Sequence, residues 1–123
     1  MNDFETILSA IEGLPIGTYI PKPKSSDSSK VYGWGQRRGE KALVYAMPNH
    51  SKRERPHKKG VTVSELRQAY DQIATTGEFT RAWFNERMPD CSKEGACNYT
   101  TIGGVLELVG VAKYDGPSVY RAR

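Results

Sequence analysis

Long apolar segments are missing from this 123-residue sequence. No run approaches the roughly 20 apolar residues that a helix needs to cross a bilayer. The chain begins Met-Asn-Asp-Phe-Glu, which is acidic and lacks both the basic start and the apolar centre of a secretory signal. We therefore expect neither a membrane-spanning nor a secreted protein, and the sequence predicts a protein of the cytoplasm.

Cysteine and histidine are scarce, with two of each. In a cytoplasmic chain Cys91 and Cys97 are most simply reduced thiols, although an oxidised loop between them is an alternative. With His50 and His57 they supply the four sulfur and nitrogen ligands that a tetrahedral zinc needs. The spacings Cys-x5-Cys and His-x6-His differ from those of common zinc fingers. We expect no metal and no other cofactor.

Familiar catalytic motifs are absent as well. The sequence has no glycine-rich phosphate-binding loop, no His-Glu-x-x-His and no Gly-x-Ser-x-Gly. One catalytic alternative is a small nuclease, in which His50 and His57 serve as general acid and base and Lys59 stabilises the developing phosphorane charge. The sequence favours a protein without enzymatic activity over this alternative.

Positive charge is present in excess and is segregated along the chain. The net charge is +4, but residues 22–60 carry 11 Lys and Arg against 3 Asp and Glu, whereas residues 61–110 carry 4 against 7. A basic segment of this density suits phosphate contact, because binding releases condensed counterions. The alternative interpretation is a solvated segment whose charges serve solubility.

The first part of the chain predicts one helix and an exposed loop. Asn2 or Asp3 is a suitable N-cap for a helix whose apolar face repeats from Phe4 to Ile11 and which ends at Gly13. Residues 21–30 have no apolar side chain other than proline, so they predict an exposed loop.

A basic β-hairpin is predicted next. Residues 30–34 and 41–47 are strand-like, and the polar residues 35–40 between them predict a six-residue connection. Residues 49–60 are too polar for core and are predicted to be a basic loop. Residues 1–60 are thus expected to extend a core formed by residues 61–123 within a single domain.

Three helices are predicted in the second half of the chain. Thr62 with Glu65, and Thr75 with Glu78, show the spacing of a capping box at a helix start. Residues 89–96 are predicted to be a loop before the third helix. The apolar residues on the three helical faces are expected to share one core: Leu66, Tyr70, Ile73, Phe79, Trp83, Ile102, Leu106 and Val109.

The last helix is predicted to lead directly into a β-hairpin. Asn98 is the expected N-cap of a helix over residues 99–109, and Gly110 occupies the place of a left-handed residue that ends it. Residues 111–121 then predict two antiparallel strands around the turn Asp115-Gly116-Pro117.

This ending resembles the last helix and wing of the winged helix-turn-helix superfamily. The resemblance rests on the Thr-containing helix start, the Leu-Val-Gly-Val-Ala junction and the Gly-containing wing ending in Val-Tyr-Arg, and it covers roughly residues 61–123. It implies an α+β fold with a winged-helix-like three-helix core and a C-terminal hairpin wing. It further implies binding of duplex DNA, with the last helix in the major groove and the wing beside it, although other members bind only proteins.

The main functional hypothesis is a small nucleic-acid-binding protein, with duplex DNA as the expected partner and with a protein-interaction module as the alternative. Its last predicted helix contains no Lys or Arg, so the basic segment is expected to supply most phosphate contacts. The predicted contact residues are Arg37, Arg38, Lys52, Arg53, Arg55, Lys58, Lys59, Tyr99, Thr100, Thr101, Lys113 and Arg121. Tyr32 and Trp34, just before the two arginines, are either stacking aromatics or core residues.

Overall fold

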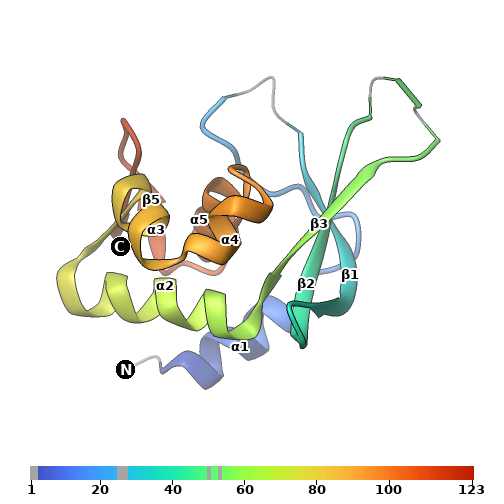
Figure 1. The fold of residues 1–123 in the computed structure, drawn as a ribbon. Helices are drawn as coiled ribbons and strands as arrows, with labels where there is room; N and C mark the ends of the chain where they lie inside the picture. Colours follow the sequence, from blue (N-terminus) through green and yellow to red (C-terminus); the bar gives the residue numbers. More distant parts are fainter. Residues whose placement is uncertain (1–2, 25–27, 50, 53) are drawn as a thin grey trace.

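The computed structural model describes residues 3–24, 28–49, 51–52 and 54–123. Within these residues the chain forms five helices and two three-stranded antiparallel sheets, and the fold is α+β (Figure 1). We refer to strands β1 to β3 as sheet A and to strands β4 to β6 as sheet B. None of the helices in the described part of the chain is both long and apolar enough to span a membrane.

Helix α1 (Phe4–Glu12) forms as predicted. The carboxylate of Asp3 accepts a hydrogen bond from the Thr6 amide at 3.0 Å, which satisfies one of the amides left open at a helix start. The helix ends at Gly13, and its apolar face is buried. Its amphipathic pattern therefore places α1 against the rest of the core.

Sheet A contains β1 (Lys30–Arg37), β2 (Glu40–Met47) and β3 (His57–Thr62) in the order β1-β2-β3. The predicted six-residue connection is wrong, because the strands stay paired up to a two-residue turn at Arg38 and Gly39. Both turn residues have positive φ, +50° and +76°, as the tight turn of a twisted hairpin requires. The predicted loop over residues 49–60 is also wrong in its last four residues, 57–60, which belong to β3.

Helix α2 (Val63–Thr76) follows β3 directly and starts with the predicted capping box of Thr62 and Glu65. The second predicted box is wrong. Gly77 ends α2 in the left-handed conformation with φ +86°, and the chain then extends as β4 (Glu78–Thr80) to pair with β6. Helix α3 (Arg81–Arg87) is instead capped by Thr80, whose hydroxyl accepts from the Trp83 amide at 3.1 Å.

The predicted loop over residues 89–96 contains a further helix, α4 (Pro89–Glu94). Proline fits the first position of a helix, since that amide has no intrahelical partner. Helix α5 (Asn98–Leu108) begins after Cys97, so the predicted cap at Asn98 is wrong. The Asn98 side chain is buried instead, where it donates to the Cys91 carbonyl at 2.9 Å and accepts from the Tyr45 hydroxyl at 2.5 Å.

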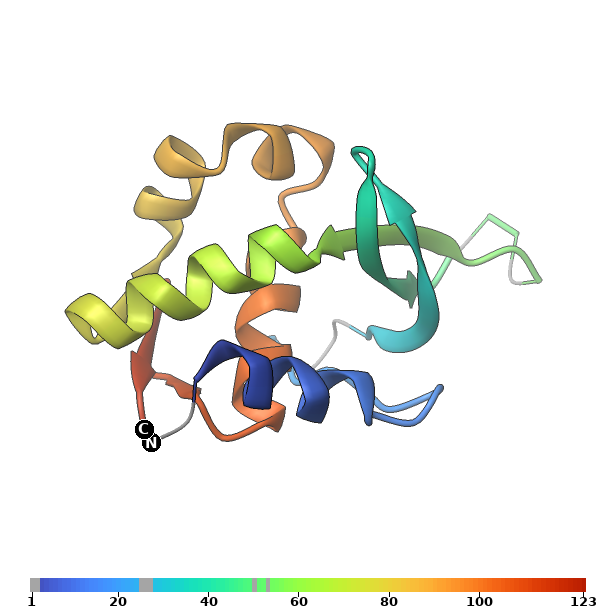
Figure 2. The same ribbon diagram turned by 90° about the horizontal axis from the view of Figure 1, so that it is seen from below.

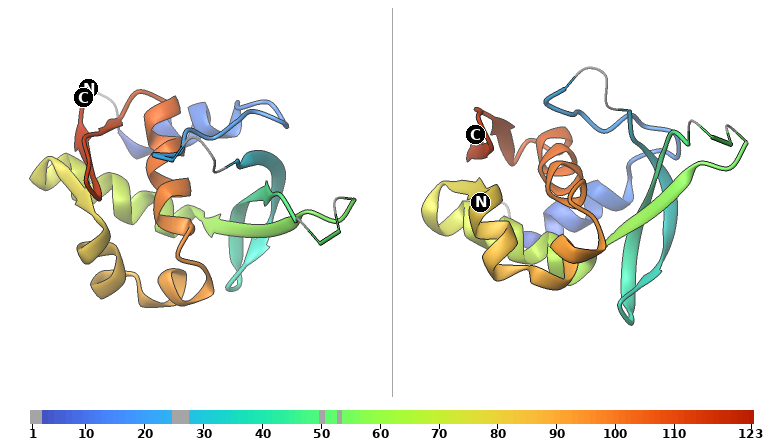
Figure 3. Two further views of the ribbon diagram at one scale, coloured as in Figure 1. Left: turned by 90° about the horizontal axis from the view of Figure 1, so that it is seen from above. Right: turned by 45° about the horizontal axis from the view of Figure 1, so that its top comes forward.

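The predicted C-terminal hairpin is confirmed. After the left-handed Gly110, with φ +81°, strands β5 (Ala112–Tyr114) and β6 (Val119–Ala122) pair antiparallel with Tyr114 opposite Tyr120. The hairpin is one part of sheet B, whose order β4-β6-β5 adds a strand that the sequence analysis did not predict. Figures 2 and 3 show α5 standing between the two sheets.

A single core cluster draws residues from both halves of the chain. Of the eight predicted core residues, five are buried: Leu66, Ile73, Phe79, Ile102 and Leu106. Tyr70, Trp83 and Val109 are half-buried and pack against the cluster. The first 60 residues contribute Ile11, Leu43 and Tyr45 to the same cluster, each fully buried, so they are a structural part of it.

Candidate nucleic-acid interface

Arg38 is the predicted contact whose role changes most. Its guanidinium forms two hydrogen bonds with the Glu65 carboxylate, at 2.8 and 2.6 Å, and donates to the Gly60 carbonyl at 2.9 Å. It also forms an ion pair with Glu94. Its side chain is only 19% exposed, and Arg38 joins the tip of the β1-β2 hairpin to the start of α2 and the end of α4. The prediction that it faces a phosphate is wrong in this structure.

The same contacts set the ionisation of the pair. Burial of the Glu65 carboxyl opposes its charged form, but the hydrogen bonds from Arg38 and the Thr62 amide outweigh burial and leave its pKa below the ordinary value. The hydrogen bonds to Glu65 are the main cause that raises the pKa of Arg38. Arg38 and Glu65 are therefore a structural ion pair, held charged by each other.

Helix α5 does not expose the predicted polar face. Tyr99 and Thr101 are 1% and 0% exposed, and the Tyr99 hydroxyl donates to the Phe79 carbonyl at 2.9 Å. Burial raises the pKa of Tyr99 accordingly. Thr100 is half-buried, and its hydroxyl accepts from the ammonium of Lys22 at 2.8 Å. The expectation that this helix presents Tyr99 and Thr101 to DNA is wrong, since sheet B and residues 20–22 cover it.

In sheet B, positive charge at the predicted wing is largely paired. Arg121 lies opposite Glu78 in the register of β4 and β6, and its guanidinium bonds to Glu78 at 2.9 Å and to Asp115 at 2.7 Å. Lys113 on β5 is exposed. The wing thus offers one cation of the predicted pair, while the other is neutralised within the sheet.

In sheet A, apolar side chains and exposed lysines lie on opposite faces. Leu43, Tyr45 and Val61 point from one face of the sheet into the core, and the helices lie on that side (Figures 1 and 2). The opposite face, which we call the outer face, carries the residues at the alternate positions. Lys30 and Lys58 both pair with Ala46, one from each side, so two exposed lysines flank an alanine across three strands.

Two further residues extend this outer face. The ring of Tyr32 is 49% exposed, and the Lys58 ammonium lies 4.2 Å from its centroid. Arg37 lies across Gly60, where a β-carbon would come within 2.7 Å of the Arg37 side chain. The absence of a side chain at Gly60 thus makes room for the stem of Arg37. Of the predicted contacts, Arg37 and Lys58 share this face, whereas Lys59 points to the other side and donates to the Glu94 carbonyl at 3.4 Å.

The loop between β2 and β3 projects beyond the same sheet (Figure 1). Lys52 and Arg55 on this loop are exposed. The predicted contact at Arg53 lies outside the described residues. The outer face and this loop therefore bring together four described members of the predicted set: Arg37, Lys52, Arg55 and Lys58.

The zinc and nuclease hypotheses depend on two histidines and two cysteines. His50, needed for both the zinc and the nuclease hypotheses, lies outside the described residues. His57 is exposed on β3, and both cysteines are free thiols, with Cys91 buried and Cys97 half-buried. Across the described residues, no three His, Cys, Asp or Glu side chains gather closely enough to hold a metal ion.

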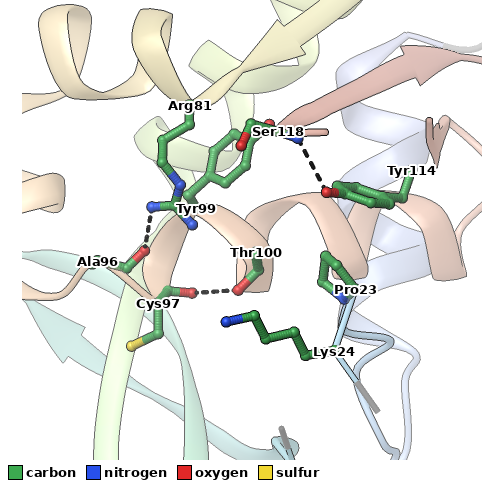
Figure 4. Close-up of a pocket in the computed structure, with 9 residues that line it drawn as sticks. All are labelled: Pro23, Lys24, Arg81, Ala96, Cys97, Tyr99, Thr100, Tyr114 and Ser118. Atoms are coloured by element: carbon green, nitrogen blue, oxygen red, sulfur yellow. Dashed lines mark hydrogen bonds between the residues drawn. The ribbon is translucent and has the colours of Figure 1, made fainter. Parts of the chain in front are cut away.

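Sequence reasoning missed a second cationic cluster, made by Lys22, Lys24 and Arg81. These residues come from the predicted loop and from the start of α3. Lys24 and Arg81 lie beside the first turn of α5 (Figure 4), and the Lys22 ammonium donates to the Thr100 hydroxyl in the same turn at 2.8 Å. Their separation in sequence, by about half of the chain, left no local pattern to signal the cluster.

Comparison of the chain with protein-family models, with curated proteins and with solved structures gives no match.

Proposed function

We propose that this protein binds nucleic acid without base readout by α5, and that the phosphate contacts come from the outer face of sheet A and the loop that follows β2. The observation that carries the proposal is the row Lys30-Ala46-Lys58, in which two exposed ammonium groups flank a neutral residue. Strands lie about 4.8 Å apart, so the two lysine backbones are about 10 Å apart, within the span over which a phosphate backbone offers repeated charges.

The row is hard to explain as a stabilising feature of the sheet. Cross-strand neighbours stabilise a sheet when their charges are opposite, and like charges do not. A carboxylate on this face, that of Glu40, lies opposite Arg37 at the tip of the hairpin, away from the row of Lys30 and Lys58, and accepts a hydrogen bond from Ser64. An external anion is therefore the natural counter-charge for Lys30 and Lys58, and Arg37 lies on the same face at the end of the row.

The winged-helix relationship of residues 61–123 belongs to the same proposal. It is supported by the passage of α5 through Gly110 into the β5-β6 hairpin. It is weakened as a model of DNA docking, because the buried face of α5 cannot enter a groove. We therefore expect binding that depends strongly on salt and little on sequence, as contacts to phosphates alone produce.

A salt titration with random duplex DNA tests the proposal. The triple variant Lys30→Ala, Arg37→Ala, Lys58→Ala should bind more weakly and lower the slope of log affinity against log salt by about 2 to 3, since each lost phosphate contact removes about 0.9. The matched control, Arg87→Ala, Lys93→Ala, Arg123→Ala, removes the same charge from exposed positions elsewhere. It should leave most of the slope intact.

Equal losses in the two triple variants would show that only net charge matters and would contradict an interface on sheet A. Absence of binding by the parent protein at low salt would reject nucleic acid as the partner. The interaction module would then be favoured, and Ile16 and Tyr19, with 77% and 67% exposure, are the first apolar side chains to examine.

A further inference from the structure

A cavity of about 480 Å³ lies beside the first turn of α5. None of its lining residues belongs to sheet A, so it is distinct from the proposed phosphate-binding face. Four segments form it: residues 23–24, the start of α3, the start of α5 and the β5-β6 hairpin (Figure 4). Its volume falls within the range of sites for small organic ligands, roughly 300–1,000 Å³, and exceeds what a lone inorganic ion requires.

Cations border this cavity without a carboxylate among its nine lining residues. The guanidinium of Arg81 lies 4.6 Å from the centroid of the Tyr99 ring and donates to the Ala96 carbonyl at 3.1 Å. Figure 4 shows the ammonium of Lys24 reaching in from the opposite side, toward Thr100. The packing on Tyr99 and the hydrogen bond to the Ala96 carbonyl orient the Arg81 guanidinium but do not neutralise its charge. The cavity therefore favours an anion.

Hydroxyl groups on the third side complete a donor set. The Tyr114 hydroxyl accepts a hydrogen bond from the Ser118 amide at 3.1 Å, which leaves its own hydrogen to donate. The hydroxyl of Ser118 lines the cavity beside it. The Thr100 hydroxyl is not part of this set, because it accepts a hydrogen bond from the Lys22 ammonium at 2.8 Å and donates its own hydrogen to the Cys97 carbonyl at 3.2 Å.

We propose that this cavity binds a nucleoside monophosphate unit, either as a free nucleotide or as the phosphorylated end of a strand. The phosphate lies between Lys24 and Arg81, where charge-assisted hydrogen bonds to its oxygens are strongest. The Tyr114 hydroxyl donates to the same group. The half-buried ring of Tyr114 offers an aromatic surface for the base, and the volume left by the phosphate accommodates the sugar.

Calorimetric titration of the full chain with adenosine 5′-monophosphate tests this assignment. Lys24→Ala should weaken binding by about 10-fold or more, since a charge-assisted hydrogen bond is lost. Because Arg81 packs on Tyr99, Arg81→Gln is the companion variant, and thermal unfolding confirms that it folds. Lys113→Ala, which removes an exposed cation of β5 outside the cavity, is the control and should bind as the parent does.

Two comparisons separate the parts of the proposal. Adenosine and inorganic phosphate should each bind more weakly than adenosine 5′-monophosphate, and equal binding of phosphate and nucleotide would overturn the nucleoside part. A 5′-phosphorylated single strand that outcompetes its unphosphorylated twin, in a manner dependent on Lys24, identifies a strand end as the source. Binding of nucleotide that is equal in the parent, Lys24→Ala and Arg81→Gln would overturn the site.

The outcome is independent of the proposed function on sheet A. The triple variant at Lys30, Arg37 and Lys58 leaves the cavity intact and should retain nucleotide binding while losing affinity for duplex. Conversely, Lys24→Ala should keep most of its duplex affinity.

Discussion

The two sheets of this protein each have three antiparallel strands, and they handle positive charge in different ways. In sheet B, Arg121 sits opposite Glu78 and also binds Asp115, so its charge is neutralised where it arises. On the outer face of sheet A, Lys30 and Lys58 flank Ala46, and Tyr32 rather than a carboxylate lies against Lys58. Cross-strand pairing thus neutralises the charge of Arg121 in sheet B, whereas the row of Lys30 and Lys58 in sheet A leaves charge available for a partner.

At the tip of sheet A, adjacent arginines have different roles. Arg38 forms a structural ion pair, and Arg37 is a proposed phosphate contact. Replacing Arg38 with alanine should lower the free energy of unfolding by about 3 kcal/mol, since it strands the buried carboxylate of Glu65. Arg37→Ala should cost less, about 1 kcal/mol, because its half-buried stem packs over Gly60 but its loss strands no buried charge. Chemical denaturation of both variants measures the difference. Equal losses would mean that the two arginines are not divided between structure and binding.

The sequence alone could not predict that Arg37 and Arg38 have different roles, and the reason is physical. Both belong to one basic dipeptide, and what separates them is a turn at Arg38 and Gly39 that aims one side chain at Glu65, 27 residues away along the chain. Local signals did predict α1, the Thr62 cap and the junction at Gly110, because each depends on residues within one helical turn. Strands β3 and β4 were missed, since they are held by pairing with distant partners.

The candidate site was predictable to the same limited extent. Charge density located Lys52, Arg55 and Lys58 correctly on an exposed part of the chain. The buried state of Tyr99 and Thr101 depends on sheet B and on residues 20–22, whose packing no periodicity reveals. Composition therefore indicated how much positive charge there was, and only the fold determined which cations face outward.

Glycines give a second way to test the contrast between the sheets. A β-carbon at Gly103 of α5 would lie 2.2 Å from the ring of Tyr120 in sheet B, whereas one at Gly35 of sheet A would lie 3.3 Å from a methyl group of Val44. Gly103→Ala should destabilise the protein by about 1–3 kcal/mol through overpacking. Gly35→Ala should be close to neutral, and thermal unfolding of the pair compares them. A neutral Gly103→Ala would mean that α5 is free to move away from sheet B.

Acid should weaken the ion pair between Arg38 and Glu65. The pKa of Glu65 is lowered in the folded protein, so its stabilising contribution is complete above the unfolded pKa, about 4.3 for a glutamate, and is lost as the pH falls through the folded value. Glu65→Gln keeps a capping-box residue but cannot ionise. The stability difference between parent and Glu65→Gln, measured by denaturant unfolding, should therefore shrink between pH 6 and pH 3. A difference independent of pH would place the contribution of Glu65 in packing.

The smallest effect is expected from the paired arginine of sheet B. The side chains of Arg121, Glu78 and Asp115 are 52%, 42% and 61% exposed, so solvent screens their attraction, and ordering three mobile side chains offsets part of it. Arg121→Ala should leave the melting temperature nearly unchanged at physiological salt, with a small decrease at low salt, where screening is weaker. It should also leave duplex binding nearly intact, because the two carboxylates already neutralise the guanidinium. Affinity that falls as much with Arg121→Ala as with Lys58→Ala would show that the ion pairs of sheet B open to receive phosphate, and the contrast between the two sheets would fail.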